Sequence, residues 1–281
     1  MKKKIYFGIT IIVFLAAIFL GGYFYFNPGS FSSPKPLPKK GESGLPTIPF
    51  KDGSEKDNRV IQNSDLSRLF PDVVYRIKET KENIVALTFD DGPDDNYTPK
   101  ILKHLKDENV KATFFVTGVR AQEFPKVLKQ IVDDGHVIGS HGFQHHKFTN
   151  SDSIKIRQDL KQNYDLIERH TKIKTKLFRP PYGELDSKSV NSIKKEGYKI
   201  ILWSIDSLDW RSLPKEEIAK NILTDIKPGA VILMHSAGDV KQDLTGSVEA
   251  VPIIIKELKK KGYTFVTIPE LFELQEYYKG K

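Results

Sequence analysis

Short apolar runs alternate with amphipathic segments through most of this 281-residue chain. The runs have the length and composition of buried strands, and the segments between them show the spacing of helices. Seven runs are expected to form strands: 84–89, 112–116, 137–140, 176–178, 199–204, 230–234 and 264–266. Strands that alternate with helices predict a mostly parallel α/β structure, and a barrel is the usual way to close one. Seven units are one fewer than the usual eight, so we expect an incomplete or distorted barrel.

The segments between the runs carry signals for helix ends. Thr98 can cap a helix with Pro99 at its first position, because a threonine oxygen accepts a free amide and proline lacks that donor. Gly135, Gly197 and Gly262 each follow a predicted helix, where a left-handed closing residue is expected. These signals support the division into strand–helix units.

Polar residues that suit catalysis follow the predicted strands at their carboxyl ends. They are Asp90 and Asp91 after the first strand, His141 and His145 after the third, Arg179 to Gly183 after the fourth, Asp206, Asp209 and Trp210 after the fifth, and His235 after the sixth. Barrels of parallel strands place their active sites at this rim. Unrelated surface residues would have no reason to share it, so we expect these side chains to meet.

Asp90 and Asp91 are adjacent in a Thr-Phe-Asp-Asp-Gly-Pro stretch that directly follows an apolar run. Taken alone, the stretch favours a simple turn, because Asp, Gly and Pro are common turn residues. Two carboxylates at a buried strand end also repel each other and lose hydration, and a cation relieves both costs. The shared rim favours this second interpretation, in which one aspartate binds a cation and the other carries out proton chemistry.

His141 and His145 are four positions apart, so on a helical turn both rings would face the same way and could share a cation. The chain has no cysteine, which excludes thiolate catalysis and thiolate metal sites. Two histidines and an aspartate leave one coordination position open, as in a hydrolytic metal site. The second carboxylate can then accept a proton from water, and His235 can return one to a leaving group. The remaining histidines are expected at the surface or in packing: His104, His136, His146 and His170.

Five motifs follow one another along this rim. They are Thr88-Phe89-Asp90-Asp91-Gly92, His141-x-x-x-His145, Arg179-x-Pro181-Tyr182-Gly183, Asp206-x-x-Asp209-Trp210 and Leu233-x-His235. Together they resemble the motifs of NodB-homology polysaccharide deacetylases (carbohydrate esterase family 4), over residues 82–275. The resemblance implies a distorted (β/α)7 barrel that removes acetyl groups from N-acetylated sugars. It also implies a divalent metal, usually zinc, with cobalt or another divalent ion as alternatives.

The resemblance also implies roles for the acidic and basic residues of the motifs. Asp90 resembles the general base of the family, and Asp91 resembles a metal ligand that acts with His141 and His145. Arg179 would hold the base through a charge-assisted hydrogen bond.

The remaining motif positions would contact the substrate or the leaving group. The backbone N–H of Tyr182 would stabilise the tetrahedral oxyanion. His235 resembles the general acid, with Asp209 orienting its ring and keeping it protonated. Trp210 and Leu233 would line an apolar slot for the acetyl methyl group, although plain core packing explains both residues equally well.

One position departs from the family pattern. Gly142 stands where the family usually has Ser or Thr directly after the first metal histidine. That hydroxyl braces the loop of the metal ligands. Its loss is expected to loosen the site or weaken metal binding unless a neighbour replaces it.

The amino-terminal segment predicts a membrane anchor. After Lys2, Lys3 and Lys4, residues 5–26 form 22 residues without a charge, enough to cross a bilayer as a helix. The preceding lysines predict an inside amino terminus with the rest of the chain outside. A cleaved signal peptide is the competing interpretation. The expected organisation is an anchor over 1–26, a flexible linker with possible short packed elements over 27–81, the catalytic domain over 82–275 and a tail over 276–281.

The net charge of +8 does not predict a nucleic-acid partner. Its lysines are scattered along predicted helices without the basic and aromatic interleaving that binds nucleic acid. The anchor and the motifs together predict a single-pass cell-membrane protein with a monomeric, wall-facing catalytic domain. The expected substrate is an N-acetylated polysaccharide, with the N-acetylglucosamine of peptidoglycan favoured. An O-acetyl esterase and a catalytically weak, tethered wall-binding protein are the alternatives.

Overall fold

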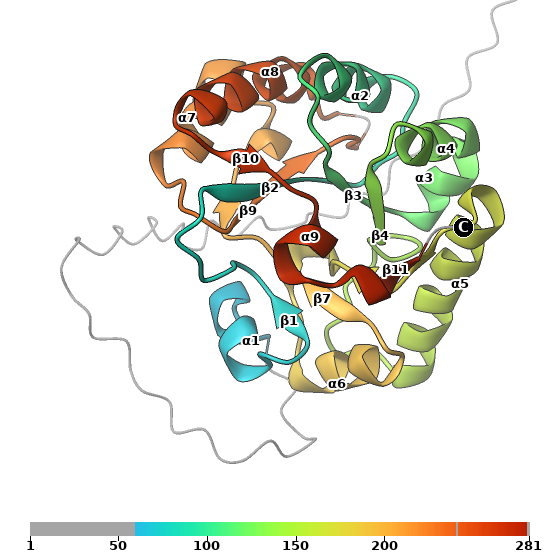
Figure 1. Cartoon of the computed structure of the whole chain (residues 1–281). Helices are drawn as coiled ribbons and strands as arrows, with labels where there is room; N and C mark the ends of the chain where they lie inside the picture. Colours follow the sequence, from blue (N-terminus) through green and yellow to red (C-terminus); the bar gives the residue numbers. More distant parts are fainter. Residues whose placement is uncertain (1–59, 240, 280–281) are drawn as a thin grey trace, which may run out of the picture. The chain divides into compact units, whose positions relative to one another are not determined.

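The computed structural model describes residues 60–239 and 241–279. The predicted anchor and the first part of the predicted linker lie outside these residues. Within the described ranges, no helix has both the length and the apolar character needed to span a bilayer. What is described is an α/β unit with one curled sheet and a surrounding layer of helices (Figure 1).

The sheet is built from parallel neighbours in the order β1-β7-β6-β4-β3-β2-β9-β8, with β10 paired to the start of β2. The bounds of its strands are β1 Val74–Tyr75, β2 Ile84–Asp90, β3 Thr113–Val116, β4 Val137–Ser140, β6 Leu177–Phe178, β7 Lys199–Ile201, β8 Ile205–Asp206, β9 Ala230–His235 and β10 Thr264–Phe265. Each predicted apolar run therefore overlaps a strand. The parallel α/β architecture is confirmed, as a curled half-barrel rather than a regular closed one.

The fifth predicted strand, 199–204, is wrong as a single element. β7 pairs with β6, whereas β8 pairs with β9 on the far side of the sheet. Between them the Leu202 N–H donates to the Tyr75 carbonyl and the Ser204 N–H donates to the Val231 carbonyl. The bend at 202–204 thus joins the two ends of the sheet through the chain itself, without a ladder between β7 and β8, and this distorts the barrel.

Helices surround the sheet because its strands are apolar on both faces (Figure 1). Their bounds are α1 Asn63–Leu69, α2 Tyr97–Asp107, α3 Gly118–Glu123, α4 Pro125–Asp133, α5 Ser153–Thr171, α6 Ser187–Lys195, α7 Lys215–Thr224, α8 Thr245–Lys260 and α9 Ile268–Phe272. Val85, Leu87 and Phe89 of β2 face the main cluster, which includes residues of α2 and α8. The alternate residue Ala86 belongs to a second cluster with Ile268 of α9.

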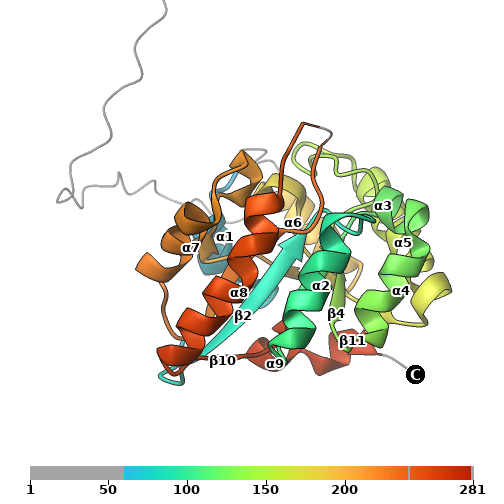
Figure 2. The same ribbon diagram turned by 90° about the horizontal axis from the view of Figure 1, so that it is seen from above.

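Helix α9 closes the amino end of the curled sheet. Figure 2 shows it at the end opposite to the arrowhead of β2. Its apolar side chains Ile268, Leu271 and Phe272 pack with Phe115 and Val231 from the inner face of the sheet. One end is therefore filled by packing, and the carboxyl ends of the strands are left to form a site.

Two local predictions about helix ends have different outcomes. The predicted cap at Thr98 is wrong, because α2 begins at Tyr97 and the Asp94 Oδ1 atom accepts the N–H groups of Asn96, Tyr97 and Thr98. The Thr98 hydroxyl instead accepts from the Asp94 N–H and donates to the Ser236 carbonyl. The left-handed closing residues Gly135, Gly197 and Gly262 are confirmed by φ angles of 80°, 79° and 80°.

The described part of the predicted linker adds to the sheet. Residues 60–81 include α1 and the strand β1, which pairs with β7. At the other end of the chain, β11 (Tyr278–Lys279) pairs antiparallel with β5 (Lys174–Thr175). Both additions lie beside the strand–helix units and contribute no residue to the cavity described below.

Candidate active site

A cavity of about 640 Å³ opens at the carboxyl end of the sheet. Its wall includes the ends of β2, β8 and β9 and the loop that follows β4. The lining residues are Asp90, Asp91, Thr117, Val119, Arg120, His141, Gln144, His145, Tyr182, Trp203, Asp206, Trp210, Leu233, His235, Gly238, Asp239 and Gln242. Most of the predicted site residues therefore meet in one cavity, and Arg179 and Asp209 contact it from behind.

Asp90 and Asp91 take different positions at the end of β2. Asp90 is the last residue of the strand and is 3% exposed, with its side chain on the inner face of the sheet. Asp91 has a left-handed φ of 70°, so its carboxylate leaves the strand direction and turns toward the histidines. A strand end followed by one left-handed residue thus separates two neighbouring carboxylates.

Arg179 holds Asp90 from the interior of the sheet. Its Nη1 atom donates to Asp90 Oδ1 and to Thr88 Oγ1, both at 2.8 Å. Its Nε atom donates to the Ile201 carbonyl at 3.1 Å, and the guanidinium lies 4.2 Å from the ring centre of Phe115. The arginine is fully buried. Since a buried ion pair is stable only with further hydrogen bonds, this network fixes the orientation of the Asp90 carboxylate.

The predicted helical turn at His141 and His145 is wrong, because both histidines lie on an irregular loop. Gly142 and His145 have left-handed φ angles of 75° and 57°. This turn still brings the two ring centres to 5.0 Å from each other. The Nε2 atoms of His141 and His145 lie 3.3 and 3.2 Å from Asp91 Oδ1. The loop conformation therefore achieves the convergence that the spacing alone suggested.

The three side chains fit a divalent metal ion. Asp91 Oδ1 is buried and has no hydrogen-bond donor. Nδ1 of His141 lies 2.8 Å from the Arg179 carbonyl and must donate to it, which leaves the Nε2 atom to face Asp91. The candidate ligand atoms of Asp91, His141 and His145 all lie within 4.8 Å of one another. Two histidines and a carboxylate suit zinc or a similar divalent ion.

Electrostatics at this cluster favour positive charge. Burial disfavours ionisation of Asp91, but the rings of His141 and His145 outweigh it and lower the pKa of Asp91 well below its ordinary value. Burial likewise disfavours protonation of His141, but Asp90 and then Asp91 raise the pKa of His141. The carboxylates of Asp90 and Asp91 therefore favour a cation at this cluster. The candidate ligand atoms of Asp91, His141 and His145 point to the same conclusion.

Neighbouring side chains brace the histidine loop where Gly142 lacks a hydroxyl. Asn163 of α5 is fully buried, and its Nδ2 atom donates to the Gly142 carbonyl at 2.8 Å and to Ser140 Oγ at 2.9 Å. Asp159, one turn earlier, accepts the Phe143 N–H at 2.8 Å. The expected loosening of the loop is thus offset by two side chains that sequence reasoning missed. Their only signal was polar residues on the inner face of an amphipathic helix.

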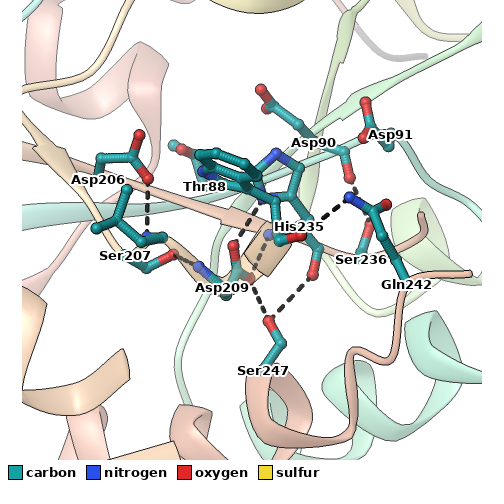
Figure 3. Close-up of polar contacts among 12 residues, drawn as sticks. Thr88, Asp90, Asp91, Asp206, Ser207, Asp209, His235, Ser236, Gln242 and Ser247 are labelled. Carbon is teal, nitrogen blue, oxygen red and sulfur yellow. Dashed lines mark hydrogen bonds and ion pairs between the residues drawn. The ribbon is translucent and has the colours of Figure 1, made fainter. Parts of the chain in front are cut away.

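His235 is held by Asp209 and Ser247 (Figure 3). Its Nδ1 atom lies 2.7 Å from Asp209 Oδ1, and Asp209 Oδ2 accepts the His235 N–H at 2.9 Å and the Ser247 hydroxyl. Burial lowers the pKa of His235, but Asp209, Asp91 and Asp90 outweigh it and raise this pKa to about 10. The ring is therefore oriented with Nε2 free and is kept protonated near neutral pH.

The predicted substrate-contacting residues line the mouth and wall of the cavity. Tyr182 has a φ of 63° and is 57% exposed, and its ring lies edge-on to His145 at 4.8 Å. Trp210 is 44% exposed, so core packing does not explain it. Leu233 is buried but contributes to the cavity wall. Trp203, which sequence reasoning missed, also lines the cavity and lies in the bend at 202–204.

The histidines assigned to packing or surface do not join the cluster. His136 is 3% exposed, packs edge-on against Phe114 and accepts the Ala112 N–H on Nδ1. Burial lowers the pKa of His136 to about 4, so this ring is neutral. Asp206, part of the fourth motif, lines the cavity and accepts the Leu208 N–H, and burial raises its pKa.

Comparisons with known proteins agree with this geometry. Residues 77–201 match the family model described as polysaccharide deacetylase. A peptidoglycan-N-acetylglucosamine deacetylase of Bacillus cereus is 41% identical over 189 residues, which cover 67% of this chain and 68% of the relative. A peptidoglycan-N-acetylmuramic acid deacetylase of Bacillus subtilis is 34% identical over 70% of this chain and 74% of its own length. The crystal structure of a peptidoglycan N-acetylglucosamine deacetylase superposes with a TM-score of 0.70 at 38% identity, covering 74% of this chain and 96% of that one.

Proposed function

This chain belongs to the polysaccharide deacetylase family, and we propose that it hydrolyses the N-acetyl groups of N-acetylglucosamine residues in an extracellular glycan, peptidoglycan above all. One observation carries the proposal. The candidate metal ligands Asp91, His141 and His145 lie in the same cavity as an arginine-held carboxylate and an aspartate-held histidine. A base and an acid in the same cavity as a cation site are the components that amide hydrolysis requires.

Asp91, His141 and His145 would hold the metal ion, which supplies Lewis-acid polarisation of the acetyl carbonyl and of water. One carboxylate oxygen of Asp90 accepts the proton of the attacking water. Arg179 donates to the other oxygen, Oδ1, and so fixes the orientation of the carboxylate. His141 Nε2 lies 3.7 Å from Asp90 Oδ2, so the base adjoins the ligand cluster. The reaction consumes one water and yields acetate and a free amine.

The other residues act on the oxyanion and the leaving group. The backbone N–H of Tyr182 stabilises the oxyanion that develops on the acetyl carbonyl. His235 donates its Nε2 proton to the departing amine, and Asp209 stabilises the protonated ring. Trp210 and Leu233 form the apolar wall against which the acetyl methyl group packs. Each predicted site residue thus has a specific role in the proposed reaction. These residues are Asp90, Asp91, His141, His145, Arg179, Tyr182, Asp209, Trp210, Leu233 and His235.

For the chain as a whole we propose a single-pass membrane protein whose catalytic domain faces the wall. Three lysines followed by 22 uncharged residues support an anchor with its amino end inside. The Pro-, Gly- and Ser-rich residues that follow support a tether. The N-acetylated polysaccharide is then a polymer within reach of the membrane. The catalytic domain is expected to act as a monomer.

Acetate release by the full chain in detergent tests the proposal. The substrates are N-acetylated peptidoglycan glycan and an O-acetylated glycan, each with zinc added or chelated. We expect zinc-dependent acetate from the N-acetylated glycan, and none above background from Asp90→Asn. Acetate from the O-acetylated glycan alone would show that the enzyme is an O-acetyl esterase and not an amidase. Release that is unaffected by both chelation and Asp90→Asn would refute the assigned chemistry.

A further inference from the structure

Arg120 is a permanent cation on the wall of a cavity that is also lined by four aspartates and by the protonated His235. It lies in α3 and is the single lysine or arginine among the residues that line the cavity. The acidic lining residues are Asp90, Asp91, Asp206 and Asp239. The reaction proposed above assigns no task to Arg120, since the base, the acid and the cation ligands are all other residues.

The Arg120 guanidinium is fixed in position but carries no counter-ion. Its Nη2 atom donates to the Gly238 carbonyl at 2.6 Å, and across the described ranges no carboxylate forms an ion pair with it. A guanidinium has five N–H donors, so one bond to a carbonyl leaves most of them available. Lys147, which lies near Tyr182, differs in this respect, because it pairs with Glu184 at 2.9 Å.

Hydrogen bonds from the start of α3 and from the Arg120 side chain connect Arg120 to two catalytic loops. At the start of α3, the Gly118 and Val119 N–H groups donate to the carbonyls of Gly142 and Phe143 in the histidine loop. The Gly238 carbonyl belongs to the loop that follows His235. The charge of Arg120 is therefore held at a set place relative to the sugar that loses its acetyl group. Fixed charges of this kind give specificity more than raw affinity.

On this basis we infer that Arg120 binds a carboxylate of the glycan, on the sugar next to the one that is deacetylated. The inference rests on the function proposed above and makes the enzyme selective for acidic, muramic-type glycans over neutral N-acetylglucosamine oligomers. An arginine fork matches a carboxylate in shape and charge. Exposed Trp210 and Tyr182 offer flat apolar surfaces to any sugar and cannot make this distinction.

The acidic lining explains why such a cation is needed. A substrate carboxylate that entered without Arg120 would face Asp206 and Asp239, and like charges at close range are unfavourable. The carboxylate has two possible sources in a wall glycan. It is either the free lactyl group of a muramic residue or an acid on the attached peptide.

The test compares wild type with Arg120→Gln, which removes the charge and keeps a side-chain N–H donor. The matched control is Lys126→Gln, which removes the same charge from an exposed residue of α4 outside the cavity. The substrates are neutral N-acetylglucosamine oligomers, glycan strands with free lactyl carboxylates and strands that retain their peptides. Acetate release gives kcat and KM, and calorimetry gives the affinity for the same glycans.

We expect Arg120→Gln to lower kcat/KM about tenfold on one or both acidic glycans, mainly through KM, and less than twofold on the neutral oligomer. The acidic strand that is affected identifies the source of the carboxylate. An equal fall on all three substrates would show that Arg120 only supports the loop, and no fall on either acidic strand would also overturn the inference. A wild type that releases no acetate refutes the proposed function, whereas the calorimetric affinities still decide the role of Arg120.

Discussion

Removal of the Asn163 side chain tests whether α5 braces the metal loop. The Nδ2 atom lies 2.8, 3.0 and 2.9 Å from the Gly142 carbonyl, the Val116 carbonyl and Ser140 Oγ, and these three acceptors share its two N–H groups. In Asn163→Ala both carbonyls keep one partner, because Gly118 N–H donates to Gly142 and His141 N–H donates to Val116. The loss is therefore that of additional hydrogen bonds, about 1 kcal/mol each. Asn163 Oδ1 is buried without a partner, so its removal returns part of this energy. We expect the free energy of unfolding to fall by about 2 kcal/mol.

The same change should weaken metal binding. Residues that orient metal ligands from behind typically alter metal affinity by about 10–100-fold when they are mutated, and we expect an increase in the zinc Kd of about tenfold. Urea unfolding and a zinc competition titration measure the two effects on the full chain. Gln162→Ala, an exposed neighbour on α5, is the control and should change neither. A fall in stability with an unchanged zinc Kd would refute the bracing role and leave Asn163 as a core residue only.

Three further predictions follow from the site and from one buried histidine. Asp91→Ala should lose zinc measured by mass spectrometry, whereas Asp90→Asn should keep zinc and lose turnover; equal zinc loss would show that the two roles are wrongly divided. Because Asp209 raises the pKa of His235, activity that needs the protonated ring persists as pH rises toward that pKa, and Asp209→Asn should move the alkaline limb of kcat at least one pH unit lower. An unmoved limb would exclude His235 as the acid. Burial lowers the pKa of His136 to about 4 in the folded protein, from 6.5 for an exposed histidine. The unfolded chain therefore binds more protons as pH falls from 6.5 to 4, and up to about 3 kcal/mol of stability is lost over that window. In urea unfolding at a series of pH values, His136→Gln should reduce the fall in the free energy of unfolding over this range. An unchanged pH dependence would show that other groups cause the loss of stability in acid.

The sheet could be predicted because the sequence of a buried parallel strand is an uninterrupted apolar run. The run 84–89 lies inside β2, and 137–140 coincides with β4. The bend in the run 199–204 could not be predicted in this way. Its residues are as apolar as those of a strand, and only the partners of Leu202 and Ser204 on two different strands show that the ladder ends there.

The site residues likewise include some that could be predicted from the sequence and some that could not. Asp91, His141 and His145 could be predicted as a group because they follow strands that end at one rim. The helical turn predicted for the two histidines was wrong, because spacing does not reveal left-handed φ angles. Arg120 could not be found from its position, and the only signal for Asn163 was a polar residue on the inner face of an amphipathic helix. Each acts through contacts with loops distant in sequence, and a polar residue on a helix carries no local mark of such a partner.

Gly142 shows why the departure from the family pattern does not indicate a failed site. With a φ of 75°, this position favours glycine, and an added Cβ would lie 3.2 Å from Asp159 Oδ1 and 3.3 Å from the ring of Phe148. The loop therefore turns tightly where a side chain would meet its neighbours. The oxygen that could have met a hydroxyl at position 142 instead accepts the Phe143 N–H, and Asn163 binds the Gly142 carbonyl from the other side. The loop is thus held from α5 rather than by a side chain of its own. Weak catalysis cannot be argued from the missing hydroxyl, because the contacts that position His141 are present by another route.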